Sequence, residues 1–101
     1  MTKIERICRI VCDEFGVTYN ELTGTTRRVP IPDARHTAMV VSIGKVDQEE
    51  ILTHFNRERT TMIHARGKVD ALSSVYPAYR NKLATITSKV RELDRVLNGQ
   101  A

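Results

Sequence analysis

Residues 57–65 read Arg57-Glu58-Arg59-Thr60-Thr61-Met62-Ile63-His64-Ala65, and they lie at the junction of two predicted helices. The first helix opens at Asp47, which with Glu50 three positions later has the form of a capping box, and it runs to Phe55. Asn56-Arg57 breaks the pattern. The second helix begins near Glu58 or Arg59 and turns Ile63, Val69 and Leu72 inward.

Two helices joined by a turn of about three residues have helix-turn-helix geometry, whose second helix can enter the major groove of DNA. Many hairpins of two helices have the same spacing, so the pattern alone leaves both interpretations open.

The preceding segments also follow helical patterns. Apolar residues at steps of three and one predict a helix that ends at Gly16, with one buried stripe: Ile4, Ile7, Cys8, Val11, Cys12 and Phe15. A short helix over 17–22 has a capping box made by Thr18 and Glu21. We expect a loop over 23–33, because it holds Pro30 and Pro32, and then a third helix from Asp33 toward Gly44.

The C-terminal segment has a heptad pattern. Pro77 is expected to open the last helix, whose apolar seam is Tyr79, Leu83, Ile86, Val90, Leu93 and Leu97. The seam either packs on the rest of the chain or forms a homodimer through Leu83–Leu97. We therefore predict an all-α fold: a compact multi-helix domain with a helix-turn-helix over 1–76, and a C-terminal amphipathic helix over 77–101.

Composition favours a small globular protein over a membrane or secreted protein. The chain has 101 residues and 41% hydrophobic residues, which suits one small globular domain. Its longest apolar run, Ala38-Met39-Val40-Val41, is far too short to span a membrane, and the N-terminus lacks a secretory signal. We therefore expect a cytoplasmic protein. Cys8 and Cys12 on the buried stripe are expected to be core residues rather than a metal or redox pair.

Charge is distributed unevenly along the chain. The net charge of +4 resolves into +3 over 24–45, −3 over 46–56 and +3 over 57–68. Two basic segments therefore flank one acidic helix, which is compatible with a polyanionic partner such as duplex DNA.

The sequence gives no support to an enzymatic function. It contains no phosphate-binding loop of the GxxxxGK[ST] form. Its three histidines, His36, His54 and His64, fall on different predicted helices without metal-ligand spacing. We predict no catalytic residues, no cofactor and no metal.

The 57–65 stretch resembles the signature of the C-terminal DNA-binding domain of the bacterial replication initiator DnaA, Gly-Gly-Arg-Asp-His-Thr-Thr-Val-Leu-His-Ala. Arg57, Thr60, Thr61, His64 and Ala65 match it, and the similarity extends over residues 11–22 and, in element order, over about 4–75. The resemblance implies a Trp-repressor-like helix-turn-helix that binds double-stranded DNA. It also implies that the protein is associated with the nucleoid. The ATPase domain that precedes this module in the family is not expected in this chain.

The resemblance also implies roles for individual residues. An arginine of the basic loop, here Arg27, enters the minor groove, and the helix starting near Glu58 enters the major groove. The implied DNA-binding residues are Arg27, Arg35, His36, Arg57, Glu58, Arg59, Thr60 and Thr61, and the chemistry of the basic segment adds Lys45. Chemistry agrees: Arg59 can grip a guanine edge, Glu58 can accept from cytosine, and Lys45 and Arg35 suit phosphates.

Three residues of the 57–65 stretch also have a simpler interpretation. Arg57 would pair with Glu50 or Glu58 at the surface, Thr60 would cap a helix, and His64 would be a packed structural residue.

The sequence also departs from the family signature. Asn56 replaces two glycines of that signature, and Arg59 stands where the family has histidine. Val29 and Asp33 stand where the family often has arginine.

We predict sequence-specific duplex binding in the control of replication initiation or transcription. The alternative is a protein-interaction module that uses the initiator-like surface or the C-terminal helix.

Overall fold

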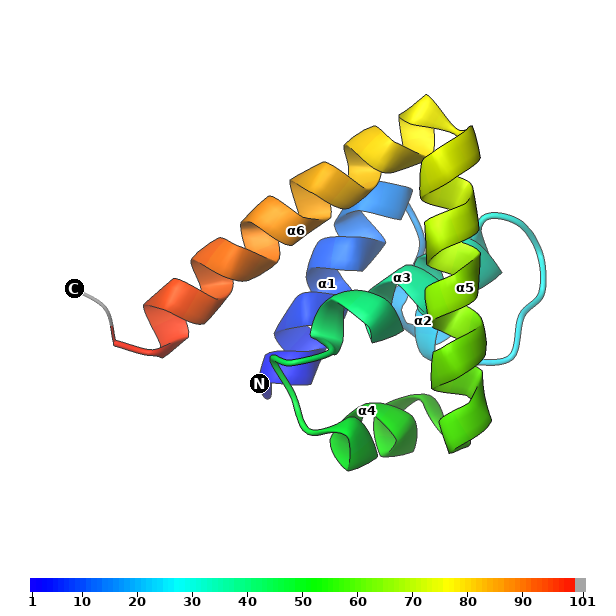
Figure 1. The fold of residues 1–101 in the computed structure, drawn as a ribbon. Helices are drawn as coiled ribbons and strands as arrows, with labels where there is room; N and C mark the ends of the chain where they lie inside the picture. The colour runs from blue at the N-terminus through cyan, green and yellow to red at the C-terminus, as the bar shows by residue number, and fades with distance from the viewer. Residues whose placement is uncertain (100–101) are drawn as a thin grey trace.

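The computed structural model describes residues 1–99, which form six α-helices and no strand. The helices are α1 (Lys3–Phe15), α2 (Tyr19–Thr23), α3 (Ile31–Ser42), α4 (Gln48–Phe55), α5 (Arg59–Val75) and α6 (Pro77–Leu97). Figure 1 shows α3 at the centre, with α1 on one side and α5 on the other. α3 also contacts α2 and α6, so four of the other helices pack against it. The all-α prediction is confirmed.

One continuous apolar core fills the space between α1, α3, α4 and α6. Cys8, Ala38 and Phe55 are fully buried in it, as are Ile7 and Ile86. Small residues on α3, such as Ala34 and Ala38, let neighbouring helices approach closely, and the larger side chains of α1 and α4 close the remaining space.

The helix boundaries mostly follow the local signals. Gly16 ends α1 in the left-handed conformation at φ 68°, and Thr18 and Glu21 form the predicted capping box of α2. The prediction for α3 was wrong at its start, because the helix begins at Ile31 and Pro32 lies in its first turn. Proline is tolerated there because the first backbone N–H groups of a helix have no intrahelical acceptor.

Two further predictions about the helix pair were wrong. Asp47 stands at the N-cap of α4, but its side chain makes no capping hydrogen bond. Ile63 is 71% exposed, because α5 turns Met62, Ala65 and Val69 to the core instead. Leu72 is half-buried. Ile63 therefore belongs to the outer surface of α5.

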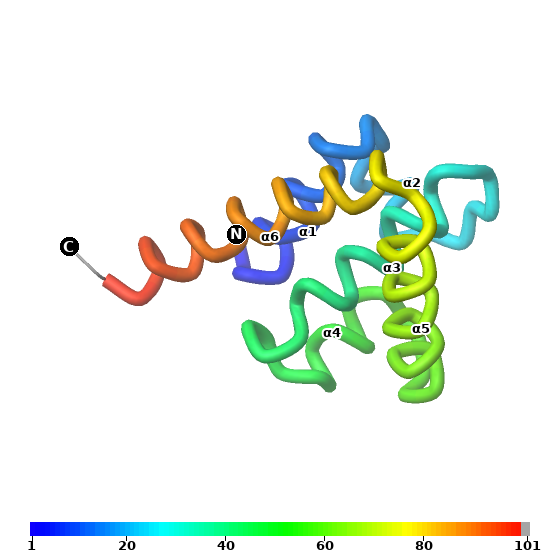
Figure 2. Tube along the Cα trace, turned by 45° about the horizontal axis from the view of Figure 1, so that its top comes forward, coloured from blue at the N-terminus to red at the C-terminus, as the bar shows by residue number. Residues whose placement is uncertain are grey.

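The last helix packs on its own chain. α6 begins at Pro77 and runs along α1, with contacts to α3 and α5 (Figure 2). Ile86 and Val90 are buried in the common core, and the buried Tyr79 hydroxyl lies 2.6 Å from Thr37 Oγ1. At the other end of α6, Asp94 pairs with Lys3 of α1. The last two residues of the predicted 77–101 segment lie outside the described residues.

Cys8 and Cys12 are core residues, so we expect their thiols to be unreactive in the folded protein. Both are buried and unpaired, and burial raises the pKa of Cys8 to about 12 and the pKa of Cys12 above its usual range. At pH 8 both thiols are therefore in the unreactive neutral form and shielded from reagent. We expect a thiol reagent such as iodoacetamide to label neither cysteine in the folded protein and both in guanidinium chloride. Rapid labelling of the folded chain would contradict the core assignment.

Among residues 1–99, no helix is both long enough and apolar enough to cross a bilayer.

Candidate nucleic-acid interface

A three-residue turn joins α4 to α5. Asn56 adopts the left-handed conformation at φ 52°, and the Arg57 backbone N–H donates to Leu52 O at 2.9 Å. Asparagine is one of the few residues that adopt this conformation readily, so the family's two glycines are not needed here. The turn lies at the lower edge of the molecule in Figure 1, where α4 meets the start of α5.

The first turn of α5 is open to solvent. Glu58 is its N-cap without a side-chain capping bond, and Glu58, Arg59 and Thr60 are exposed, whereas Thr61 is half-buried. Since Glu58 is the cap, the alternative of Thr60 as cap is wrong. The first backbone N–H groups of a helix point outward and carry the positive end of the helix dipole, so this turn suits an anion such as a phosphate.

Arg59 reaches across to the preceding helix. Its Nη2 donates to Glu49 Oε1 at 3.1 Å, and both side chains are more than two-thirds exposed. Sequence reasoning missed Glu49 because it assigned the acidic helix no part in the site. Glu49, Glu58 and Arg59 line one open hollow of about 420 Å³ between α4 and the turn.

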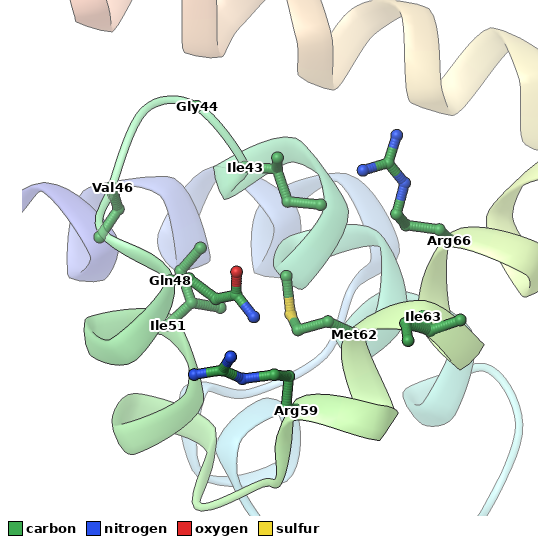
Figure 3. A pocket seen from close by; sticks show the side chains of 9 residues that line it. All are labelled: Ile43, Gly44, Val46, Gln48, Ile51, Arg59, Met62, Ile63 and Arg66. Atoms are coloured by element: carbon green, nitrogen blue, oxygen red, sulfur yellow. The ribbon is translucent and has the colours of Figure 1, made fainter.

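A second hollow, of about 400 Å³, lies on the other side of Arg59. Figure 3 shows Arg59 extending from α5 toward Gln48 on α4, while Met62 points into the hollow. Ile63 and Arg66 continue the same lining further along α5. The first two turns of α5 therefore present a surface with basic and apolar groups side by side.

Arg57 has an anchoring role. Its guanidinium donates to Phe55 O at 2.7 Å and to Gly24 O at 3.0 Å. Within the described residues its recorded partners are backbone carbonyls, and neither Glu50 nor Glu58 forms the surface ion pair that was the simpler interpretation. Arg57 thus ties the loop after α2 to the turn before α5.

Arg35 is also turned inward. Its residue exposure is 6%, with Nε donating to Leu22 O and Nη2 to Glu21 O, each at 2.8 Å. Burial, and secondarily the charge of Arg57, lower the pKa of Arg35. The guanidinium satisfies carbonyls in the last turn of α2, which leaves it little surface for a phosphate.

These two anchors hold the loop that carries Arg27. Arg27 is exposed, and its neighbour Arg28 pairs with Glu21 of α2 at 3.1 Å. Both views place this loop beside α5 (Figure 1 and Figure 2). Two sequence-distant basic segments, the loop and the start of α5, are therefore fixed relative to one another.

The two remaining predicted contacts lie apart, His36 near α5 and Lys45 near α6. His36 is half-buried, its ring lies 5.7 Å from that of His64 on α5, and its Nδ1 has no hydrogen-bond partner among the described residues. Burial and His64 lower the pKa of His36. His64 itself is exposed, against the packed interpretation. Lys45 follows α3 and lies 3.7 Å from Asp94 of α6.

No cluster of three or more metal-ligating side chains occurs within residues 1–99. The side chains that this surface offers include cations, the hydroxyls of Thr60 and Thr61, and the carboxylates of Glu49 and Glu58. The cations suit binding to a polyanion.

Comparison with known proteins agrees with this arrangement. The family model of the bacterial dnaA protein helix-turn-helix matches residues 4–69, from α1 into α5. The chain is 28% identical over 90 residues to the chromosomal replication initiator protein DnaA of Chlorobaculum tepidum. That alignment covers 86% of this chain and 18% of the relative, so the chain spans under a fifth of the protein it matches. The family match covers more than half of the chain and includes the α4–α5 pair, and the chain therefore belongs to the family of the helix-turn-helix domain of bacterial DnaA protein.

Proposed function

We propose that the chain binds duplex DNA sequence-specifically and without enzymatic activity, in the control of replication initiation or transcription at the nucleoid. The observation that carries the proposal is the exposed first turn of α5 in a DnaA-type helix-turn-helix. The relative is named a replication initiator, and this supports replication as the process, although the match covers only 18% of that protein.

In the major groove we assign base reading to the start of α5. Arg59 is positioned to donate two hydrogen bonds to guanine, and Glu58 to accept one from a cytosine amino group. Thr60 and Thr61 offer a methyl group to thymine or a hydroxyl to phosphate. This assignment is supported by their position at the start of α5, because a recognition helix contacts base edges with its N-terminal residues.

In the minor groove we assign Arg27. A narrow minor groove over A·T-rich DNA has a strong negative potential that attracts an inserted arginine. Arg35 and Arg57 support this role indirectly, because they bind backbone carbonyls at the start of the loop that carries Arg27. In this proposal Arg35 and Arg57 act by positioning the loop, and Arg27 is the residue that enters the minor groove.

Phosphate contacts complete the proposal. Lys45 shares Asp94 of α6 with Lys3 and keeps a partly exposed side chain. His36 of α3 faces His64 of α5 and lies close to the charge of Lys68. Such contacts fix register on the duplex rather than read sequence.

Salt dependence tests the proposal. The association constant for a mixed duplex pool, followed by fluorescence anisotropy, is expected to fall linearly with salt on a log–log plot, with a slope near −0.9 per phosphate neutralised. The variant Arg27→Ala/Arg59→Ala is expected to bind more weakly, with a shallower slope. Wild-type binding in the double variant, or no duplex binding at low salt, would overturn the proposal.

A protein-interaction module is the second candidate, and it rests on the exposed apolar end of α6, where Val96 is 59% and Leu97 is 44% exposed. The predicted homodimer through Leu83–Leu97 would have to use this end, because Ile86 and Val90 are buried in the core of their own chain.

We expect the free chain to be monomeric. The buried part of the seam has no apolar surface left for a second copy, and one exposed helical turn is a small area for a stable dimer. Multi-angle light scattering is expected to give the chain mass of 11.5 kDa. A mass twice as large that is lost on changing Leu97→Lys would favour the second candidate.

A further inference from the structure

We propose that Glu49 is a specificity-determining residue that positions Arg59 for base reading, an inference that rests on the proposed duplex binding. Nothing in the sequence pattern assigns Glu49 to the site. The structure places it ten residues from Arg59 in sequence and one hydrogen bond away in space, at 3.1 Å.

The position of Glu49 brings it to the same surface as the predicted base readers. It lies in the first turn of α4, and it lines one hollow together with Glu58 and Arg59. A carboxylate in the first turn of a helix is stabilised by the helix dipole, whereas Arg59, in the first turn of α5, stands at the end where a cation is disfavoured. Glu49 therefore gives Arg59 its compensating charge.

The geometry of the guanidinium makes the pair useful for reading a base. The group is planar and has five N–H donors in a fixed fork, and the bond to Glu49 uses a donor on Nη2. A guanine edge needs two donors, so the guanidinium can be held by Glu49 and still grip a base. A long side chain fixed before binding loses less conformational freedom when the complex forms.

The ion pair between Arg59 and Glu49 is not explained by a contribution to folding stability. The Arg59 and Glu49 side chains are 73% and 77% exposed, and solvent-exposed ion pairs contribute little to folding. Glu49 also adds a negative charge where phosphates are expected, so by charge alone it weakens nonspecific binding. We therefore expect Glu49 to increase the discrimination between bases and not to increase the total affinity for DNA.

The experiment uses the duplex that the unmodified chain selects from a random pool, together with every single-base-pair variant of that duplex. Relative affinities are measured for the wild type, Glu49→Ala, Arg59→Ala and the double variant. We expect Glu49→Ala to lower discrimination at the base pair read by Arg59 by about 2- to 12-fold, the factor expected for ordering one long side chain. In the Arg59→Ala background, Glu49→Ala is expected to change nothing further at that base pair.

Glu50→Ala is the matched control, because Glu50 lies in the same turn of α4, is exposed and carries the same charge. It is expected to raise affinity for all duplexes equally. The inference would be overturned if Glu49→Ala behaved like Glu50→Ala, or raised affinity uniformly, with base preference intact. If the unmodified chain bound no duplex at all, the proposed function would fail first, and this inference with it.

Discussion

Replacing Arg35 with methionine is expected to lower the free energy of unfolding by about 2–4 kcal/mol, because it leaves two inward-facing carbonyls without donors. These are Glu21 O and Leu22 O in the last turn of α2, each 2.8 Å from the guanidinium. Methionine keeps much of the side-chain length and fills the space. The loss is therefore mainly that of the hydrogen bonds, and urea unfolding followed by circular dichroism measures it.

The same variant separates an anchoring role from a phosphate contact. Arg27→Met, which removes the same charge from an exposed loop position, is expected to leave the urea midpoint unchanged. If Arg35→Met kept wild-type stability but bound duplex more weakly, with a salt slope reduced by about one phosphate, Arg35 would contact DNA directly.

Replacing Arg59 with alanine is expected to cost about 1–3 kcal/mol of discrimination at one or two base pairs, the usual contribution of a bidentate arginine contact to guanine. Stability is expected to change little, since the side chain is 73% exposed. Anisotropy titrations with the selected duplex and its single-base-pair variants measure the loss.

Arg59→Lys is the informative companion, because lysine keeps the charge and lacks the planar fork. We expect it to retain most of the nonspecific affinity and to lose base preference nearly as fully as alanine does. Retained preference in Arg59→Ala would assign base reading to another residue of the turn.

The helices could be predicted where local signals decide them. The stripe on α1 ends at Gly16 because only a residue that tolerates positive φ continues the chain there, and the capping box at Thr18 is complete within four residues. Pro32 was misplaced because proline is permitted in the first turn of a helix as well as in a loop. Sequence alone does not separate these two cases.

The site was predictable only in part, since its chemistry depends on contacts between helices. The resemblance located the start of α5 and also assigned Arg35 and Arg57 to the interface. The structure turns both guanidinium groups toward backbone carbonyls. Whether a cation faces solvent or a carbonyl is decided by where α2 ends relative to α3 and α5. Glu49 was missed for a related reason, because the crossing of α4 and α5 brings it to Arg59.

Selection of bound sequences from a random duplex pool by the unmodified chain tests the central claim most directly. The claim predicts a recovered motif whose most constrained base pairs include a guanine, with an A·T-rich flank, and in which Arg59→Ala relaxes the guanine and Arg27→Ala relaxes the flank. Recovered sequences indistinguishable from the input pool, or no recovery at low salt, would contradict sequence-specific duplex binding.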